Sequence, residues 1–203
     1  MKEYLQHTIE GNNISQEKLQ IPDISLNTET IKVVMINEVP PKNPEDHFYS
    51  NSLEPEYMKT TLSLFHNANV PVSSIQDIIN MGIYITTAVK SPKDEYTVST
   101  ESIINHLPIL EQELKSFPNL KVIMLMGDVA KKAFNLISKK NTKRNTIPSG
   151  STYKIRSDEF YYGNIRVFPS YIMTGGNILI EKSKCVMISE DIQKMHKIIF
   201  PNL

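Results

Sequence analysis

Cysteine is nearly missing from this chain of 203 residues, in which Cys185 is the only one. A single cysteine excludes an internal disulfide and any cysteine-rich metal or cluster site. The histidines and carboxylates show no metal-ligand spacing either, so we predict neither a metal nor another cofactor. No run of about 18 apolar residues occurs, so no membrane span is expected. Residues 1–6 lack the apolar core of a signal peptide, and we therefore expect a cytoplasmic protein.

A net charge is also missing, because 22 basic and 22 acidic side chains balance each other. Their distribution is uneven, however: the segment from Lys115 to Arg156 holds ten basic residues and one acid, Asp128. Such an asymmetry indicates a surface that faces a polyanion, with Lys143 and Arg144 as candidate phosphate contacts. The alternative is an ordinary solvated basic face.

Short apolar segments alternate with amphipathic segments along the chain. Four apolar segments are predicted as main strands, at 31–36, 82–89, 120–126 and 165–169. Helices are predicted at 55–67, 74–79, 99–117, 128–140 and 185–199, and a small hairpin or edge strand at 153–156 and 160–162. This alternation predicts an α/β fold, a three-layer αβα arrangement around a central four-stranded, mostly parallel sheet. We expect a polar, loosely packed lead-in over 1–30, with room for one short helix, and a single domain over 31–203.

The most informative stretch is 31–41, where a β-branched apolar run ends in Glu38 and, one residue later, in two prolines. In open α/β sheets, ligands bind in the crevice beyond the carboxyl ends of the strands. An acid on a stiff loop at that position is a candidate general base or water-orienting group. The alternative is a solvated turn residue. The other strand ends that should gather in the same crevice are 86–90, 127–128 and 170–176.

Four short segments match, in order and spacing, the motifs of a known superfamily. They are Asn37-Glu38-Val39-Pro40-Pro41, Thr86-Thr87-Ala88-Val89-Lys90-Ser91, Met124-Leu125-Met126-Gly127 and Ser170-Tyr171-Ile172-Met173-Thr174. With them the chain resembles the uracil-DNA glycosylase superfamily over residues 31–199, closest to its thermostable, iron–sulfur branch. The resemblance implies the fold of that superfamily and a nucleobase-excising DNA glycosylase of DNA repair. Such an enzyme hydrolyses an N-glycosidic bond, here with Glu38 positioning the water.

Three departures from the family pattern alter this expectation. Ile172 replaces the family's histidine, and Thr87 replaces the asparagine that recognises uracil. A hydroxyl cannot reproduce the paired donor and acceptor of an amide, so the identity of the base is left open. Ser91 replaces a cysteine that ligates the cluster, and we expect no iron–sulfur cluster.

The resemblance also implies a base pocket and a DNA-contacting surface. For the base pocket we predict Asn37, Pro40, Phe48, Tyr49, Thr86, Thr87, Ile172 and Thr174, with Phe48 or Tyr49 stacking on the base. For the nucleic-acid contacts we predict Lys90, Ser170, Tyr171, Gly175 and Gly176, together with Lys143 and Arg144. His47 lies in the first loop, where it could replace the missing histidine in space.

Two other functions compete with the enzyme. A catalytically degenerate protein could keep the fold and bind nucleic acid without turnover, because a fold does not determine a function. A small nucleotide- or nucleoside-binding protein has the least support, because no Gly-rich phosphate loop follows a strand.

Overall fold

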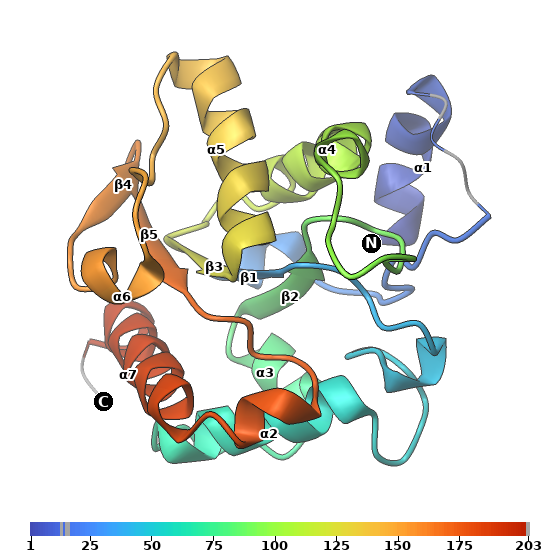
Figure 1. Ribbon diagram of the computed structural model, residues 1–203. Helices are drawn as coiled ribbons and strands as arrows, with labels where there is room; N and C mark the ends of the chain where they lie inside the picture. Colours follow the sequence, from blue (N-terminus) through green and yellow to red (C-terminus); the bar gives the residue numbers. More distant parts are fainter. Residues whose placement is uncertain (13, 15–16, 202–203) are drawn as a thin grey trace.

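A five-stranded sheet runs through the middle of the molecule (Figure 1). In this computed structural model, which describes residues 1–12, 14 and 17–201, the order of the strands is β2-β1-β3-β5-β4. Their bounds are β1 (Val33–Asn37), β2 (Ile83–Thr87), β3 (Val122–Met126), β4 (Phe160–Tyr162) and β5 (Ile165–Ser170). All neighbours pair in parallel except β4, which is antiparallel to β5. The α/β class and the mostly parallel sheet are confirmed, and the predicted count of four strands is corrected to five.

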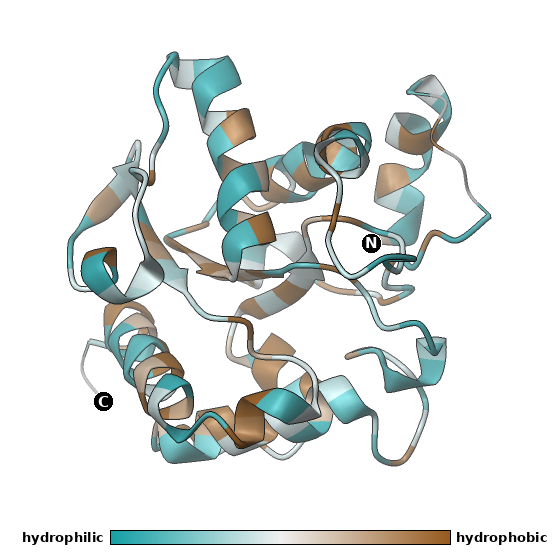
Figure 2. Cartoon of the chain, viewed as in Figure 1, coloured by the Kyte–Doolittle hydropathy of each residue, from teal (hydrophilic) through white to brown (hydrophobic). Residues whose placement is uncertain are grey.

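The helices cover both faces of the sheet, which makes three layers. Their bounds are α1 (Lys2–Gly11), α2 (Glu56–Asn67), α3 (Ile75–Asn80), α4 (Thr100–Lys115), α5 (Asp128–Thr142), α6 (Thr152–Ile155) and α7 (Lys182–Ile199), with short 3-10 turns η1 (Thr28–Thr30), η2 (Pro44–Asp46) and η3 (Gly176–Leu179). One core lies between the sheet and α2, α3 and α7, and a second lies between the sheet and α4 and α5. Figure 2 shows apolar residues concentrated in the strands and polar residues on the outer sides of the helices.

The three adjoining strands β2, β1 and β3 are buried along their whole length. Strands buried on both faces need continuous apolar or β-branched runs, which is why the sequence shows them so clearly. Among the helices of the described residues, none combines the length and the apolar character that a membrane crossing requires.

Two local predictions are corrected. Residues 153–156 lie largely in helix α6, because Thr152 and Ile155 are both buried, three residues apart, while Tyr153 and Lys154 between them are exposed. That spacing suits one helical turn and not a strand, whose sides alternate. The lead-in does contain one short helix, α1, as allowed for, but this helix is not loosely packed, because its Leu5 and Ile9 are buried against Ile109 of α4.

The order of the strands also creates a crevice. From β1 the chain passes to β2 on one side and later to β3 on the other, so β1 lies between them. In open α/β sheets such a switch point leaves room for a ligand beyond the carboxyl ends of the strands. Glu38 follows β1 directly, and Gly127 and Asp128 follow β3, so the topology brings these segments together.

Candidate functional site

A cleft of about 1030 Å³ opens at the ends of β1, β3 and β5. Its lining includes Glu38 and Val39 after β1, Gly127 and Asp128 after β3, and most of residues 170–178 at and after the end of β5. Lys93 and Tyr96 and residues 150–153 also contribute. Helix α2 adds Glu56 and Tyr57 from its first turn. Figure 1 shows the loop after β5 running from the sheet to η3, which lies next to α2. Strand ends that are far apart in the sequence therefore meet at one hollow.

Glu38 is partly buried and held by the start of α5. Its Oε1 accepts a hydrogen bond of 3.1 Å from the backbone N–H of Val129. Amides at a helix N-terminus favour a carboxylate, because the helix dipole is positive there. Burial nevertheless raises the pKa of the Glu38 carboxyl above its usual range, and this effect outweighs the Val129 hydrogen bond. Glu38 is thus a fixed group with a raised pKa, unlike a solvated turn residue.

Gly127 permits a close approach of the backbone to Glu38. Its φ is +107°, and a Cβ at this residue would lie 2.5 Å from Oε1 of Glu38 and 2.7 Å from Cγ1 of Ile172. The carboxylate and the Ile172 side chain therefore lie beside each other at Gly127. Ile172, which stands where the resemblance predicted a replaced histidine, presents only an apolar wall to the carboxylate.

The double-glycine turn lies in the same cleft, but one of its amides is already engaged. The N–H of Gly176 donates to Oε1 of Glu56 over 2.9 Å. A phosphate at this amide, as we predicted, would have to displace a carboxylate. Thr174, two residues earlier, also lines the cleft and lies next to the Tyr57 hydroxyl.

Tyr57 is a cleft residue that the sequence analysis missed. Its hydroxyl donates to the carbonyl oxygen of Val39 over 3.4 Å, and burial raises the pKa of the phenol. Its only signal in the sequence is its place in the first turn of the helix that follows the long first loop. The apolar stripe of that helix draws attention to Met58 and Phe65 instead.

Lys90 and Thr86 lie elsewhere, on the α4 face of the sheet. Lys90 is fully buried, and its Nζ forms an ion pair of 2.5 Å with Oε2 of Glu113. The Thr86 hydroxyl donates to the same carboxylate. Contrary to our prediction, the Lys90 ammonium has no surface on which to meet a phosphate, and the Thr86 hydroxyl is directed away from the Glu38 cleft.

The two candidate stacking residues are part of the packed interior. Phe48 is 1% exposed and packs against Tyr57, with ring centroids 5.2 Å apart. The Tyr49 hydroxyl donates to the carbonyl of Ile85 (2.7 Å) and accepts from its N–H (3.0 Å), which completes the outer edge of β2. Neither ring lines the cleft, so stacking on a base would require the first loop to move.

Three more predicted pocket residues are buried beside the cleft, not in it. Asn37 and Thr87 face each other in register across β1 and β2, and Pro40 is buried in the loop after β1. Within residues 1–12, 14 and 17–201, Oδ1 of Asn37 has no hydrogen-bond partner. His47 does not replace the missing histidine, because it is outside the cleft lining and burial lowers its pKa to about 4.

Ser170 and Tyr171 form the side of the cleft next to α7. The Ser170 hydroxyl donates to Oδ2 of Asp191 over 2.7 Å, and Asp191 is ion-paired to Arg156 at 2.7 Å. Ser170 is itself fully buried, so of these two residues only Tyr171 could contact nucleic acid. Nζ of Lys184 lies 5.8 Å from the centroid of the Tyr171 ring.

Acids outnumber bases around the cleft. Glu38, Glu56, Asp128 and Glu181 line it, against Lys93 and Lys184. Asp128 and Glu181 are neutralised by ion pairs with Lys131 and Lys184. The predicted phosphate contacts Lys143 and Arg144 are exposed at the far end of α5. Since 15 helical residues span roughly 22 Å, this basic end is separated from Glu38 by the length of the helix.

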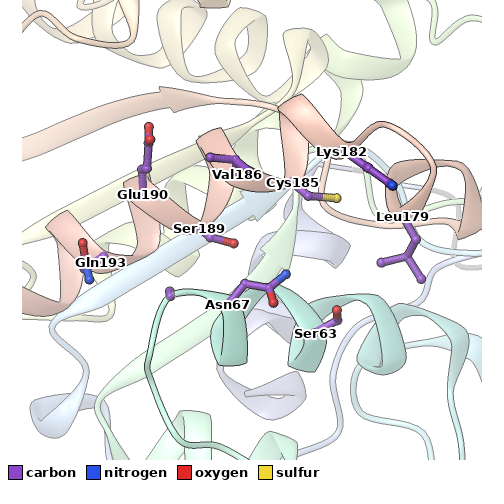
Figure 3. A pocket seen from close by; sticks show the side chains of 10 residues that line it. Ser63, Asn67, Leu179, Lys182, Cys185, Val186, Ser189, Glu190 and Gln193 are labelled. Atoms are coloured by element: carbon purple, nitrogen blue, oxygen red, sulfur yellow. The ribbon is translucent and has the colours of Figure 1, made fainter.

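A second hollow, of about 460 Å³, lies between α2 and α7 (Figure 3). Ser63 and Asn67 project from α2 toward Cys185 and Ser189 of α7. The Cys185 thiol donates to the carbonyl of Ile178, and burial raises its pKa, so it stays protonated and a poor nucleophile. In the part of the chain that the structure describes, no three His, Cys, Asp or Glu residues are grouped to hold a metal ion.

Comparison with known proteins does not identify a family. No protein-family model matches the chain, and no curated protein sequence matches it either.

Proposed function

We propose that the protein is a nucleobase-excising DNA glycosylase of the uracil-DNA glycosylase type. The observation that supports this most is Glu38, a fixed and partly buried carboxylate at the switch point of the sheet, facing a cleft of about 1030 Å³. Pockets for small ligands are usually about 300–1000 Å³, so a nucleobase with its sugar fits.

The chemistry requires one water molecule and one carboxylate that holds it and acts as its general base. When the bond between the base and C1′ breaks, the sugar becomes electron-poor and a water must attack it. A carboxylate offers about four acceptor positions, of which the α5 amides occupy a minority, so Glu38 can hold a water while remaining anchored. Its negative charge also stabilises the positive charge on the sugar.

DNA would place only the flipped nucleotide in the cleft, because the base must leave the stack to be reached. The acids around the centre disfavour a phosphate there. Lys93 and Lys184 line the cleft, and they are the candidate contacts for phosphates on either side of the flipped nucleotide, although Lys184 would have to leave its ion pair with Glu181.

The test is incubation with oligonucleotides that contain uracil or hypoxanthine, followed by alkaline cleavage of abasic sites. Glu38→Gln should slow excision by about 10²–10⁴-fold, as expected for loss of a general base. Glu159→Gln, which changes an exposed acid just before β4, is the matched control and should leave the rate unchanged. Absence of abasic product from every substrate would remove the enzyme from consideration.

The pH profile gives a second test of Glu38. Because the pKa of its carboxyl is raised, activity should fall on acidification at a higher pH than for an exposed glutamate, whose pKa is about 4.3. Only the deprotonated form can take a proton from water. An activity that is constant down to pH 4 would contradict the assignment.

A small-nucleoside hydrolase or binding protein is the second candidate, and the excess of acids around the cleft favours it. The substrate used and the dependence on salt concentration distinguish this candidate from the DNA glycosylase. Excision from DNA should weaken as salt rises, because phosphate contacts release counterions, whereas binding of free deoxyuridine or deoxyinosine should hardly change. Salt-dependent DNA binding without turnover would instead indicate the degenerate nucleic-acid-binding protein.

A further inference from the structure

Glu38 can position the attacking water in the cleft, but the departing nucleobase also needs a hydrogen-bond donor. The base leaves with the electron pair of the broken bond, and preorganised donors stabilise that negative charge. Ile172 cannot donate. The N–H of Val129 is used by Glu38 and that of Gly176 by Glu56, so neither amide is available without a rearrangement. A side chain of the cleft lining can supply this donor: besides the ammonium groups of Lys93 and Lys184 and the Asn177 amide, the lining carries several hydroxyls.

Tyr57 has the best position among those hydroxyls. It lines the cleft from the first turn of α2, and its hydroxyl contacts the carbonyl of Val39, the residue that follows Glu38 in the chain. Its contact with the Val39 carbonyl is 3.4 Å long, well beyond the 2.5–3.0 Å of a good O–H···O hydrogen bond. The hydrogen of this hydroxyl can therefore turn to a ligand at little cost.

The ring and the proton of Tyr57 are both held in place. Phe48, buried in the core, packs on the ring at 5.2 Å and fixes its direction. Burial is the largest cause of the raised pKa of the phenol, so the hydroxyl keeps its proton at neutral pH and acts as a donor. A neutral donor in a partly dry site is well suited to a developing anion.

We infer that Tyr57 is a catalytic residue whose hydroxyl donates a hydrogen bond to a carbonyl oxygen of the departing nucleobase, in place of the missing imidazole. This inference rests on the proposed function. The bond from C1′ to the base nitrogen breaks, and its electron pair stays on the base. The water oxygen bonds to C1′, and one water proton passes to Glu38 and then through solvent to the base nitrogen.

The experiment compares Tyr57→Phe with the wild type on two leaving groups of different acidity. The first pair of substrates is an oligonucleotide with uracil and one with 5-fluorouracil, whose anion is more stable. If the wild type excises hypoxanthine instead, xanthine is its more acidic partner. Tyr161→Phe, which removes an exposed hydroxyl in β4, is the matched control. Single-turnover rates are measured at a temperature at which thermal melting shows every variant folded.

Tyr57→Phe should slow excision of the less acidic base by about 10²-fold, the usual effect of losing one such donor. The loss should be smaller on the more acidic base, which needs the donor less, and Tyr161→Phe should match the wild type. Equal losses on both bases, or no loss, would overturn the role of Tyr57 while leaving the glycosylase intact. If the wild type excises no base, the proposed function fails, and the assignment of Tyr57 fails with it.

Discussion

Gly127 joins the fold to the candidate site, so replacing it tests both. In Gly127→Ala, the new Cβ would lie within 3 Å of both the Glu38 carboxylate and the Ile172 side chain. The backbone at this residue has φ of 107° and ψ of 175°, a region that only glycine occupies readily. The substitution therefore strains the main chain and pushes the carboxylate away from the start of α5.

Two contributions determine the size of the effect. Holding alanine in that backbone region costs about 1–3 kcal/mol. Moving Glu38 away from the Val129 amide removes a helix cap, which costs about 0.5–2 kcal/mol. We expect Gly127→Ala to lower the free energy of unfolding by about 1.5–5 kcal/mol. Activity should fall together with it, because Glu38 no longer holds its place.

Urea denaturation followed by circular dichroism measures this change. Gly163→Ala is the matched control, since Gly163 has a positive φ of 58° but a Cβ added there would meet no atom of the described residues within 4 Å. It should cost only about 1 kcal/mol. In a Glu38→Ala background, Gly127→Ala should cost about 0.5–2 kcal/mol less. Equal costs at Gly127 and Gly163, or no relief from Glu38→Ala, would refute the close approach.

Two further substitutions test the buried polar groups. Glu113→Gln leaves the Lys90 ammonium buried without its partner and should cost about 3–5 kcal/mol at pH 7. Burial lowers the pKa of Lys90, so the folded variant binds fewer protons than the unfolded chain, and the penalty should shrink as pH rises toward 10 in urea titrations. A penalty below about 1 kcal/mol, or one that grows with pH, contradicts this. Asn37→Leu removes a buried acceptor that lacks a partner among the described residues, together with a long hydrogen bond of 3.5 Å from its Nδ2 to the Thr86 carbonyl. It should be neutral or stabilising by up to about 1–3 kcal/mol; a clear loss of stability would show that the amide oxygen is engaged as well.

The sheet and most helices could be predicted because their signals are local. A strand buried on both faces is an unbroken apolar run, and residues 122–126 are one. Ser99 stands at the start of the helix predicted at 99–117, and its hydroxyl accepts the N–H of Ser102 at 3.0 Å as a helix cap. Such features depend only on residues a few positions apart, which a sequence displays directly.

The Lys90–Glu113 pair could not be predicted, because it joins residues 23 positions apart through the fold. Both residue types are rarely buried unless they are paired, so on general grounds each looked like a surface group. The apolar stripe of α4 gives no sign that Glu113 is also buried. The resemblance assigned Lys90 to nucleic acid, whereas its partner in the structure is the Glu113 carboxylate on α4.

For Glu38, the two interpretations of the sequence do not exclude each other. A carboxylate that caps a helix is held in one orientation, and a general base needs that fixed geometry before the substrate arrives. The Val129 amide stabilises the ionised form, while burial disfavours it, and the net effect is a raised pKa. A raised pKa makes the ionised carboxylate a stronger base toward water. The anchoring of Glu38 to α5 is therefore a property that the proposed chemistry requires.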